Sequence, residues 1–350
     1  MSQETNQFMY DNWLSGMELA HGKPWWSNIA TDNPANHYEG AIPVEAVEKL
    51  FGFDVNLSRV FVMNSKGEII EATEFVACVP DNKDAVFGIH SKSFSVKGHQ
   101  FREWLVNGPA KVINGTVGIS NAGLLKDGAQ AWVNISTPQE WETPQGVDFR
   151  PNLLWTTAFD GSIASTVKET DVLSVCDNTR EAALRSKGLS YKVKHTKNSE
   201  FKLEDAKAAL HLLEQNAEAF SKEIATLCEW SVSDAQFERF MSQLVPMPEI
   251  TDKDINKRDY STRTATIAAN KRAQLNELYR LDGRVEPWKG TAFGVLQMVN
   301  TFQTHIATQR NADHRAIRNM ENVISGKIAA SDIDALSLLA KICDRELVAA

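Results

Sequence analysis

The chain has 350 residues, of which 43% are hydrophobic and 23% charged, and its formal net charge at pH 7 is −8. This composition is typical of a globular protein with apolar material for one or two cores, and it excludes an extended disordered chain. No apolar run approaches the roughly 18 residues of a membrane span, and the first ten residues lack the basic and apolar regions of a secretory signal.

The first 110 residues predict short elements separated by clear turn signals. Pro43 and Gly52 bracket a short helix, as proline and glycine commonly do at helix starts and ends. Residues 59–79 read as two strands around a Ser-Lys-Gly turn, and another short strand should follow. Gly108 and Pro109 should end a second short helix.

The middle of the chain, from about residue 111 to 176, predicts an antiparallel meander. It is rich in β-forming residues, and Lys-Asp-Gly and Asp-Gly turns punctuate it, because glycine accepts a positive φ. Its last strand, residues 172–176, should be buried. A short helix should then begin at Asp177 or Asn178, whose side chains can accept its free N–H groups, and end at Gly188.

After Asn198 the apolar residues take up the period of a helix. They recur at spacings of three and four and form one stripe of about seven turns. We expect this helix, capped at Ser199, to pack across the sheet that precedes it; pairing with a second subunit is the alternative. The stripe consists of Leu203, Ala206, Leu210, Leu213, Ala217, Phe220, Ile224 and Leu227.

Residues 246–261, with two prolines and mixed charge, predict a linker. Before it, residues 1–245 should form an α+β core domain with an N-terminal extension. After it, residues 262–350 should form a helical region, with helices near 262–281, 290–320 and 331–348, the last capped by Ser331. The predicted fold class is therefore α+β: an antiparallel β-meander packed by a long helix, followed by a C-terminal helical region.

The sequence lacks several motifs of catalytic and cofactor-binding sites. It has no phosphate-binding loop ending in Gly-Lys-Ser/Thr, no Gly-x-Gly-x-x-Gly after a strand, and no Cys-x-x-Cys or His-x-x-x-His pair. We therefore expect no cofactor, no metal site and no catalytic residue, and an enzyme is not favoured. The four separated cysteines fit a reducing compartment. Acid pairs such as Glu204-Asp205 could bind magnesium, so a metal-dependent nuclease stays a third hypothesis.

Two segments are basic although the chain is acidic. Residues 180–197 contain six Lys or Arg against one Glu, and residues 253–289 contain nine against five acids. Cations bind phosphates and aromatic rings stack on bases, so these segments suit single-stranded nucleic acid; solvated faces balanced by acids elsewhere are the alternative. The candidate nucleic-acid-binding residues are Lys192, Lys194, His195, Lys197, Arg258, Arg263, Lys271 and Arg272, with Tyr191 and Tyr260 to stack on bases.

Three blocks resemble a known family. They read "NAGLLKDGAQAWVNIS", "FDGSIASTVKETDVLSVCDNTREAAL" and "WKGTAFGVLQMVNTFQTH". In order and spacing they resemble the phage/plasmid-like proteins classed as a domain of unknown function (nine-three-two). The resemblance implies a phage or mobile-element origin and a bacterial cytoplasm, but no function. Trp26 and Phe159 stand where that family often has histidine, which weighs against a shared catalytic role.

A looser resemblance concerns topology. Antiparallel strands followed by one long helix are similar to single-strand annealing recombinases, which form rings and hold DNA in a basic groove without ATP. This implies a homo-oligomer, with a ring as one form, that binds single-stranded DNA, or RNA, and no membrane. The leading hypothesis is an ATP-independent single-stranded DNA-binding and annealing protein of recombination or replication. The alternative is a non-enzymatic protein-binding regulator or inhibitor of a host or defence enzyme.

Overall fold

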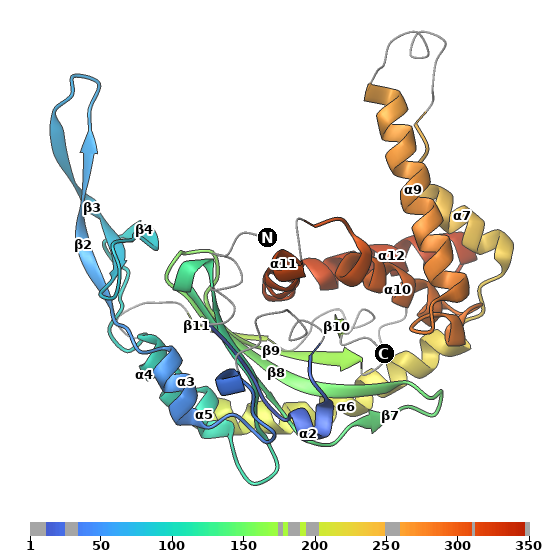
Figure 1. The fold of residues 1–350 in the computed structure, drawn as a ribbon, viewed down its shortest axis with the longest axis horizontal. Coiled ribbons are helices and arrows are strands. Elements are labelled where there is room, and N and C mark those ends of the chain that lie inside the picture. Colours follow the sequence, from blue (N-terminus) through green and yellow to red (C-terminus); the bar gives the residue numbers. More distant parts are fainter. Residues whose placement is uncertain are drawn as a thin grey trace.

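The computed structural model describes residues 12–24, 34–173, 178–180, 190–193, 203–248, 260–309 and 312–346. A large antiparallel sheet forms its middle layer (Figure 1), which confirms the predicted meander. The strand order is β1-β5-β6-β8-β9-β10, with β11 also paired to β9 and β7 to β8. The bounds are β1 Trp13–Ser15, β5 Gly118–Leu125, β6 Gln130–Ser136, β7 Trp141–Glu142, β8 Asp148–Ala158, β9 Ser165–Leu173, β10 Asn178–Arg180 and β11 Ser190–Val193.

One face of this sheet is apolar and is covered by helices. Residues that pair directly across antiparallel strands have side chains on the same side of the sheet. We call such a line of paired residues across the strands a row, and the register assigns each row to one face. Helices α3 (Val44–Leu50), α4 (Phe101–Asn107) and α5 (Pro109–Val112) pack on the apolar rows. These rows contain Leu14, Ala122, Val133, Trp155 and Val167, and then Ile119, Ile135 and Leu153.

The long helix α6 (Leu203–Glu229) crosses the same face, as predicted from its apolar stripe. Its buried residues Ala217, Phe220, Ile224 and Leu227 keep the spacing of three and four. The ring of Phe220 lies 4.9 Å from that of Phe149 on β8, centroid to centroid. Figure 1 shows α6 and the three short helices below the sheet. The expected cap at Ser199 lies outside the described residues.

The C-terminal helices form a second core around α10, in which every residue is buried. Tyr279 stacks on Phe237 at 3.9 Å, and its hydroxyl accepts the N–H of Gly290. No helix within the described ranges is long and apolar enough to cross a membrane. The helices are α7 Asp234–Leu244, α9 Tyr260–Leu281, α10 Ala292–Thr301, α11 Ala312–Ile324 and α12 Lys327–Cys343, with shorter α2 Glu18–His21, η2 Pro34–Asn36, η3 Lys126–Gly128, η4 Glu286–Trp288 and the π-helical turn η5 Phe302–Ile306.

A separate three-stranded sheet projects from one end of the molecule, and we call it the arm. It contains β2 (Val55–Met63), β3 (Ile69–Pro80) and β4 (Gly88–Ser91) in the order β2-β3-β4. Gly67 has a φ of 81° in the turn between the first two strands, as the Ser-Lys-Gly signal predicts. The arm and α9 rise at opposite ends, on the side of the large sheet away from α6 (Figure 1).

The predicted start of a short helix at Asp177 or Asn178 is wrong, and the rest of that helix, residues 181–188, lies outside the described residues. Asn178–Arg180 forms β10, which pairs with Asp171–Leu173 of β9. Two strands, β10 and β11, therefore follow the strand that the sequence indicated as the last one. Without β10 and β11, the N–H and C=O groups on one edge of β9 would be unpaired. The stabilisation from pairing these groups outweighs the preference of Asp177 or Asn178 to cap a helix.

The start of the last helix also differs from the prediction. Helix α12 begins at Lys327, so Ser331 lies inside it, where its hydroxyl accepts a hydrogen bond from the Gln303 amide. Gly326, with a φ of 75°, turns the chain sharply from α11 into α12. A β-carbon disfavours that conformation, which explains why the break falls at the glycine.

Candidate functional site

The second face of the large sheet is polar, and we call it the polar face. Its rows are given by the same register as the apolar rows. Its apolar residues Trp13, Leu125, Trp132 and Leu154 form one cluster at one part of the face. Buried hydroxyl and amide groups need hydrogen-bond partners. A sheet face that carries many of them therefore contacts other polar groups, from the protein or from a ligand. The first row contains Trp13, Gly123, Trp132, Thr156 and Thr166, and the second contains Ser15, Asn121, Asn134, Leu154 and Lys168. Further rows contain Ser136, Asn152 and Thr170, and then Arg150 and Val172.

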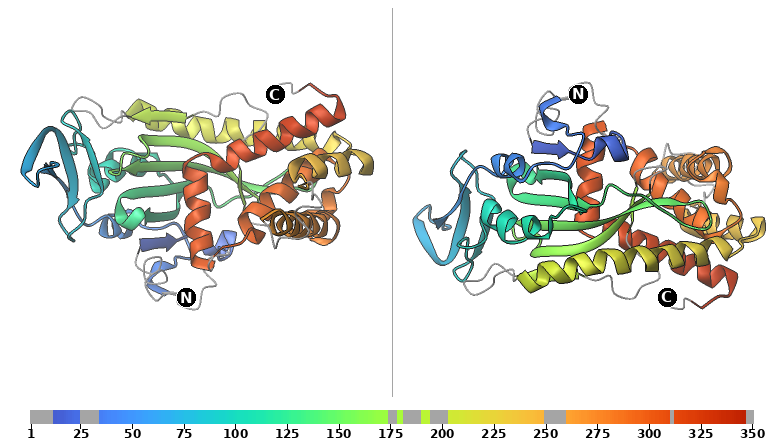
Figure 2. Two further views of the ribbon diagram at one scale, coloured as in Figure 1. Left: turned by 90° about the horizontal axis from the view of Figure 1, so that it is seen from above. Right: turned by 90° about the horizontal axis from the view of Figure 1, so that it is seen from below.

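Helix α11 crosses part of this face (Figure 2). Its residues Ala316 and Val323 pack on Trp13 and Trp132 in a small apolar cluster. Lys168 donates to the Val323 carbonyl at the end of α11, where a cation also stabilises the helix dipole. These contacts fasten α11 over one part of the polar face and leave the rest open to a cavity.

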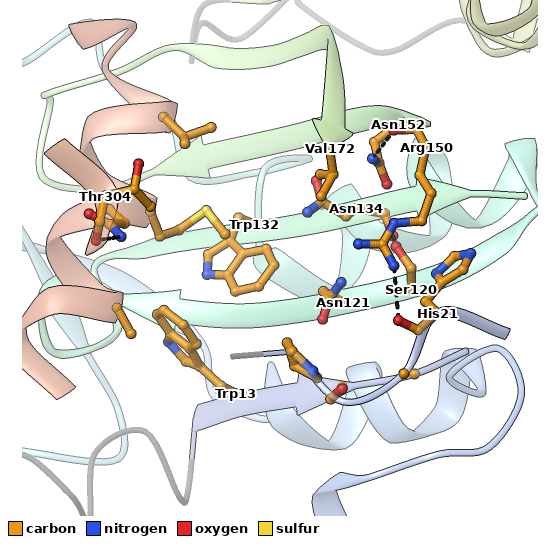
Figure 3. A pocket seen from close by; sticks show the side chains of 18 of the residues that line it. Trp13, His21, Ser120, Asn121, Trp132, Asn134, Arg150, Asn152, Val172 and Thr304 are labelled. Atoms are coloured by element: carbon orange, nitrogen blue, oxygen red, sulfur yellow. Dashed lines mark hydrogen bonds between the residues drawn. The ribbon is translucent and has the colours of Figure 1, made fainter. Parts of the chain in front are cut away.

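The cavity has a volume of about 120 Å³ and lies between strands β5, β6 and β8, the segment around α2, the turn η5 and helix α11. Figure 3 shows Trp13 and Trp132 towards one end and Arg150 with His21 towards the other. Ser15 and Ser120 are buried within it, whereas Gly22 is exposed. The volume is several times what one water molecule occupies, so the cavity can admit a small polar group from outside.

Arg150 gives the cavity a positive end. Only 7% of the residue is exposed, and its Nη1 donates to the His21 carbonyl at 3.0 Å (Figure 3). The carboxylate of Glu140 lies 3.8 Å away. A guanidinium has a planar fork of N–H donors and a positive charge, and both suit oxygen acceptors. This end of the cavity therefore favours a ligand with anionic or carbonyl oxygens.

His21 should make stability depend on pH. Burial, and then the charge of Arg150, lower the pKa of His21 below its usual 6.5. Below about pH 6.5 this histidine binds a proton in the unfolded chain more readily than in the folded chain. The free energy of unfolding should therefore be constant above about pH 6.5 and decrease as the pH drops below it. In His21→Gln the fall should be smaller. Urea unfolding at about pH 7.5 and pH 5.5 measures it, and equal falls in both proteins would contradict the assignment.

Several buried polar atoms in the cavity have no hydrogen-bond partner among the described residues. They are the hydroxyl oxygen of Ser15, the amide oxygen of Asn134 and the indole nitrogen of Trp132. Leaving such an atom unsatisfied costs about 1–3 kcal/mol. The three residues that carry these atoms line the same cavity, so a hydroxyl, an amide and an indole belong to one polar region, as in many ligand sites.

The two tryptophans at the end of the cavity are held in a fixed arrangement. Their rings meet edge to face, 5.4 Å apart, and Trp13 donates its indole N–H to the Leu124 carbonyl. Gly123 pairs with both residues across the sheet. A β-carbon there would lie 2.8 Å from Trp132 and 2.9 Å from Trp13, so glycine is required for the pair to form.

The comparisons with known proteins decide the family. A model of the domain of unknown function DUF932 matches residues 97–324. The chain belongs to the DUF932 family. The match runs from before α4 to the last residue of α11, so it includes most of the polar face but not β1 and α2. No curated protein and no solved structure matches this DUF932 chain.

In this DUF932 protein, one predicted residue lies on the polar face. Lys192 of β11 is exposed and pairs with Thr166, on the row that continues to Thr156 and Trp132. The backbone of Tyr191 pairs with Val167, and Tyr260 begins α9. Lys194, His195, Lys197 and Arg258 lie outside the described residues.

The predicted cations of α9 lie elsewhere. Arg272 donates to the carbonyls of Val245 and Ser242 at 2.7 and 3.3 Å, so it caps the end of α7. The ammonium of Lys271 lies 5.5 Å from the ring centroid of Phe302, and Arg263 is exposed. Figures 1 and 2 place β11 and α9 in different parts of the molecule. Among the described residues, Lys192 and the cations of α9 therefore do not form one patch.

The sequence did not identify Arg150, Ser15, Asn121 or Asn134. A signal was present in "QAWVNIS", residues 130–136, where Trp132, Asn134 and Ser136 alternate with smaller apolar residues. Such alternation indicates a strand with one face against a core and a different environment on the other. Among the residues that the structure describes, no three or more His, Cys, Asp or Glu side chains lie close enough to bind a metal ion together.

Proposed function

We propose that this DUF932 protein binds single-stranded DNA on the polar face of its large sheet and promotes annealing without ATP. One observation carries the proposal: residues with unsatisfied hydroxyl, amide and indole groups line one cavity on a single sheet face, and the buried cation Arg150 lines the same cavity. The edges of unpaired bases present donors and acceptors of this kind, and Arg150 can bind a base oxygen or a phosphate.

A single strand fits this surface better than a duplex. The polar groups are recessed in a cavity of about 120 Å³, so a duplex cannot present its paired bases to them, whereas a base turned out of a flexible strand can enter. Lys192 on the same face would bind the phosphates that follow. Lys194, His195 and Lys197 directly follow β11 in sequence and would extend this contact.

Annealing adds further expectations to the proposal. Because α6 lies on the apolar face, the strand would bind on the part of the polar face that α11 does not cover. A second copy would bring a second strand, so the active form would be a homo-oligomer. Arg263 and Lys271 on α9 would then contact phosphates farther along the path of the DNA. Arg258 would also contact phosphate, and Tyr191 and Tyr260 would stack on bases.

Binding of a labelled oligothymidylate, followed by fluorescence anisotropy over a range of salt concentrations, tests the proposal. The logarithm of the affinity should fall linearly with the logarithm of the salt concentration, and Lys192→Ala should reduce the slope by about 0.7, because one phosphate fewer is neutralised. Lys92→Ala, a change at an exposed lysine next to the arm, is the matched control and should leave the slope unchanged. An absence of binding at low salt would refute the proposal, and duplex DNA and RNA serve as competitors.

A further inference from the structure

The tip of the arm exposes an unusual amount of apolar surface. Six large side chains there are between 44% and 72% exposed: Phe61, Val62, Met63, Ile69, Ile70 and Phe75. Together they present on the order of 600 Å² per chain, which is what each partner contributes at the lower end of standard protein interfaces. Exposed apolar surface of this extent, gathered on two paired strands, indicates a contact site.

Both sides of the arm are apolar at its tip. By the β2–β3 register, Met63 pairs with Ile69 and Val62 pairs with Ile70, so the two pairs point to opposite sides. No helix or strand of the described chain covers either side (Figure 1). At its base, in contrast, the arm is anchored by the buried residues Val55 and Cys78. The arm is thus a fixed projection whose outer half lacks a partner within the described chain.

The strand β2 also offers a free edge. It is the outermost strand in the order β2-β3-β4, so beyond Val55, whose N–H and C=O bond the Gln100 side chain, no strand of the described chain pairs with its outer edge. Proteins usually protect such an edge with several charges or a proline, but Arg59 is the only charged residue on β2. An unprotected edge beside apolar side chains can accept another strand.

Charge and symmetry identify the partner. Residues 55–80 contain Arg59 and Lys66 against Glu68, Glu71 and Glu74, so the arm has no excess of cations with which to bind nucleic acid or acidic lipid. A second copy of β2, related by a two-fold axis, would pair antiparallel and satisfy both free edges at once. If Phe61 to Met63 of the copies lie opposite each other, the two Arg59 side chains stay apart. We infer that the arm is a self-association site that joins two copies of the chain, arm to arm.

Sedimentation of the full chain without nucleic acid tests this inference. The wild type should sediment at twice the 39.0 kDa of one chain. The double variant Met63→Lys/Ile69→Lys should sediment as a single chain, with self-association weakened at least about tenfold, since two desolvated charges would face apolar groups. Both residues are about 70% exposed, so the changes should leave the far-UV circular dichroism unaltered.

Leu281→Lys is the matched control. Leu281 is 78% exposed at the end of α9, far from the arm, so this variant should remain a dimer. A wild type that is monomeric at all concentrations would overturn the inference and would leave a different protein as the partner of the arm. Dissociation of the Leu281→Lys variant, or persistence of the dimer in the arm variant, would also overturn it. Because no DNA is present, the outcome is separate from that of the oligonucleotide experiment.

Discussion

Replacement of Arg150 by methionine is expected to weaken the binding of a single-stranded oligonucleotide at least about tenfold. Methionine preserves much of the volume of the side chain but removes the only Lys or Arg among the described residues that line the cavity. A hydrogen bond to a charged group contributes about 1.5–3 kcal/mol, and about 1.4 kcal/mol corresponds to a factor of ten in affinity. Fluorescence anisotropy at fixed low salt measures the change.

Two further variants separate the role of Arg150 in binding from its role in the fold. The guanidinium also donates to the His21 carbonyl, so Arg150→Met should lose some stability, which urea unfolding measures independently. Arg150→Lys keeps the positive charge but loses the planar arrangement of N–H donors, so its affinity should lie between those of the wild type and Arg150→Met. Arg59→Met makes the same chemical change on the exposed arm and should bind like the wild type. Equal affinity of Arg150→Met and the wild type would remove the cavity from the binding surface.

The architecture of the chain could be predicted where a pattern extends over many residues. The apolar stripe that ends at Phe220, Ile224 and Leu227 predicted α6 and its buried side, because a regular spacing allows only one face to meet the sheet. The turn glycines and β-rich runs predicted the meander in the same way. The prediction was wrong at Asn178, where the decisive factor is the open edge of β9, a feature of the assembled sheet and not of the local sequence.

The candidate site could not be predicted, because its residues meet only through strand register. Ser15 is more than 100 residues from Asn121, and Asn121 and Asn134 lie on consecutive strands, yet the three lie side by side across β1, β5 and β6. Serine and asparagine also favour turns and caps, so their occurrence singly in short runs gives no indication of a shared surface. A shift of one residue in the register of a strand would move its polar residue to the apolar face. The site therefore depends on the strand register, which the sequence does not reveal.

The sequence shows where Lys and Arg residues are concentrated, but whether each of them can bind a ligand depends on its neighbours in the fold. Arg272 was a candidate for binding phosphate, and in the structure it donates to two carbonyls at the end of α7. A helix end leaves carbonyls without partners, and a long cationic side chain nearby can satisfy them. Charge density along the sequence therefore overestimates how many basic residues are free to bind a ligand.

Substitution of Gly123 by alanine is expected to lower the free energy of unfolding by about 1–3 kcal/mol and to disturb the cavity. The added β-carbon would lie less than 3.0 Å from the rings of both Trp13 and Trp132. Neither ring can move easily, since Trp13 is hydrogen-bonded to Leu124 and both pack against α11. Urea unfolding measures the loss, and oligonucleotide affinity should fall with it, because the indole of Trp132 lines the cavity.

Gly115→Ala is the matched control for this prediction. No atom lies within 4 Å of a β-carbon built at Gly115, so alanine there should change stability by less than about 0.5 kcal/mol. If Gly123→Ala were as stable as Gly115→Ala, the tryptophan pair would not be the rigid end of the cavity. If Gly123→Ala lost stability but bound the oligonucleotide normally, the rings would serve the fold alone, and ligand recognition would depend on Arg150 and the amide groups of the polar face.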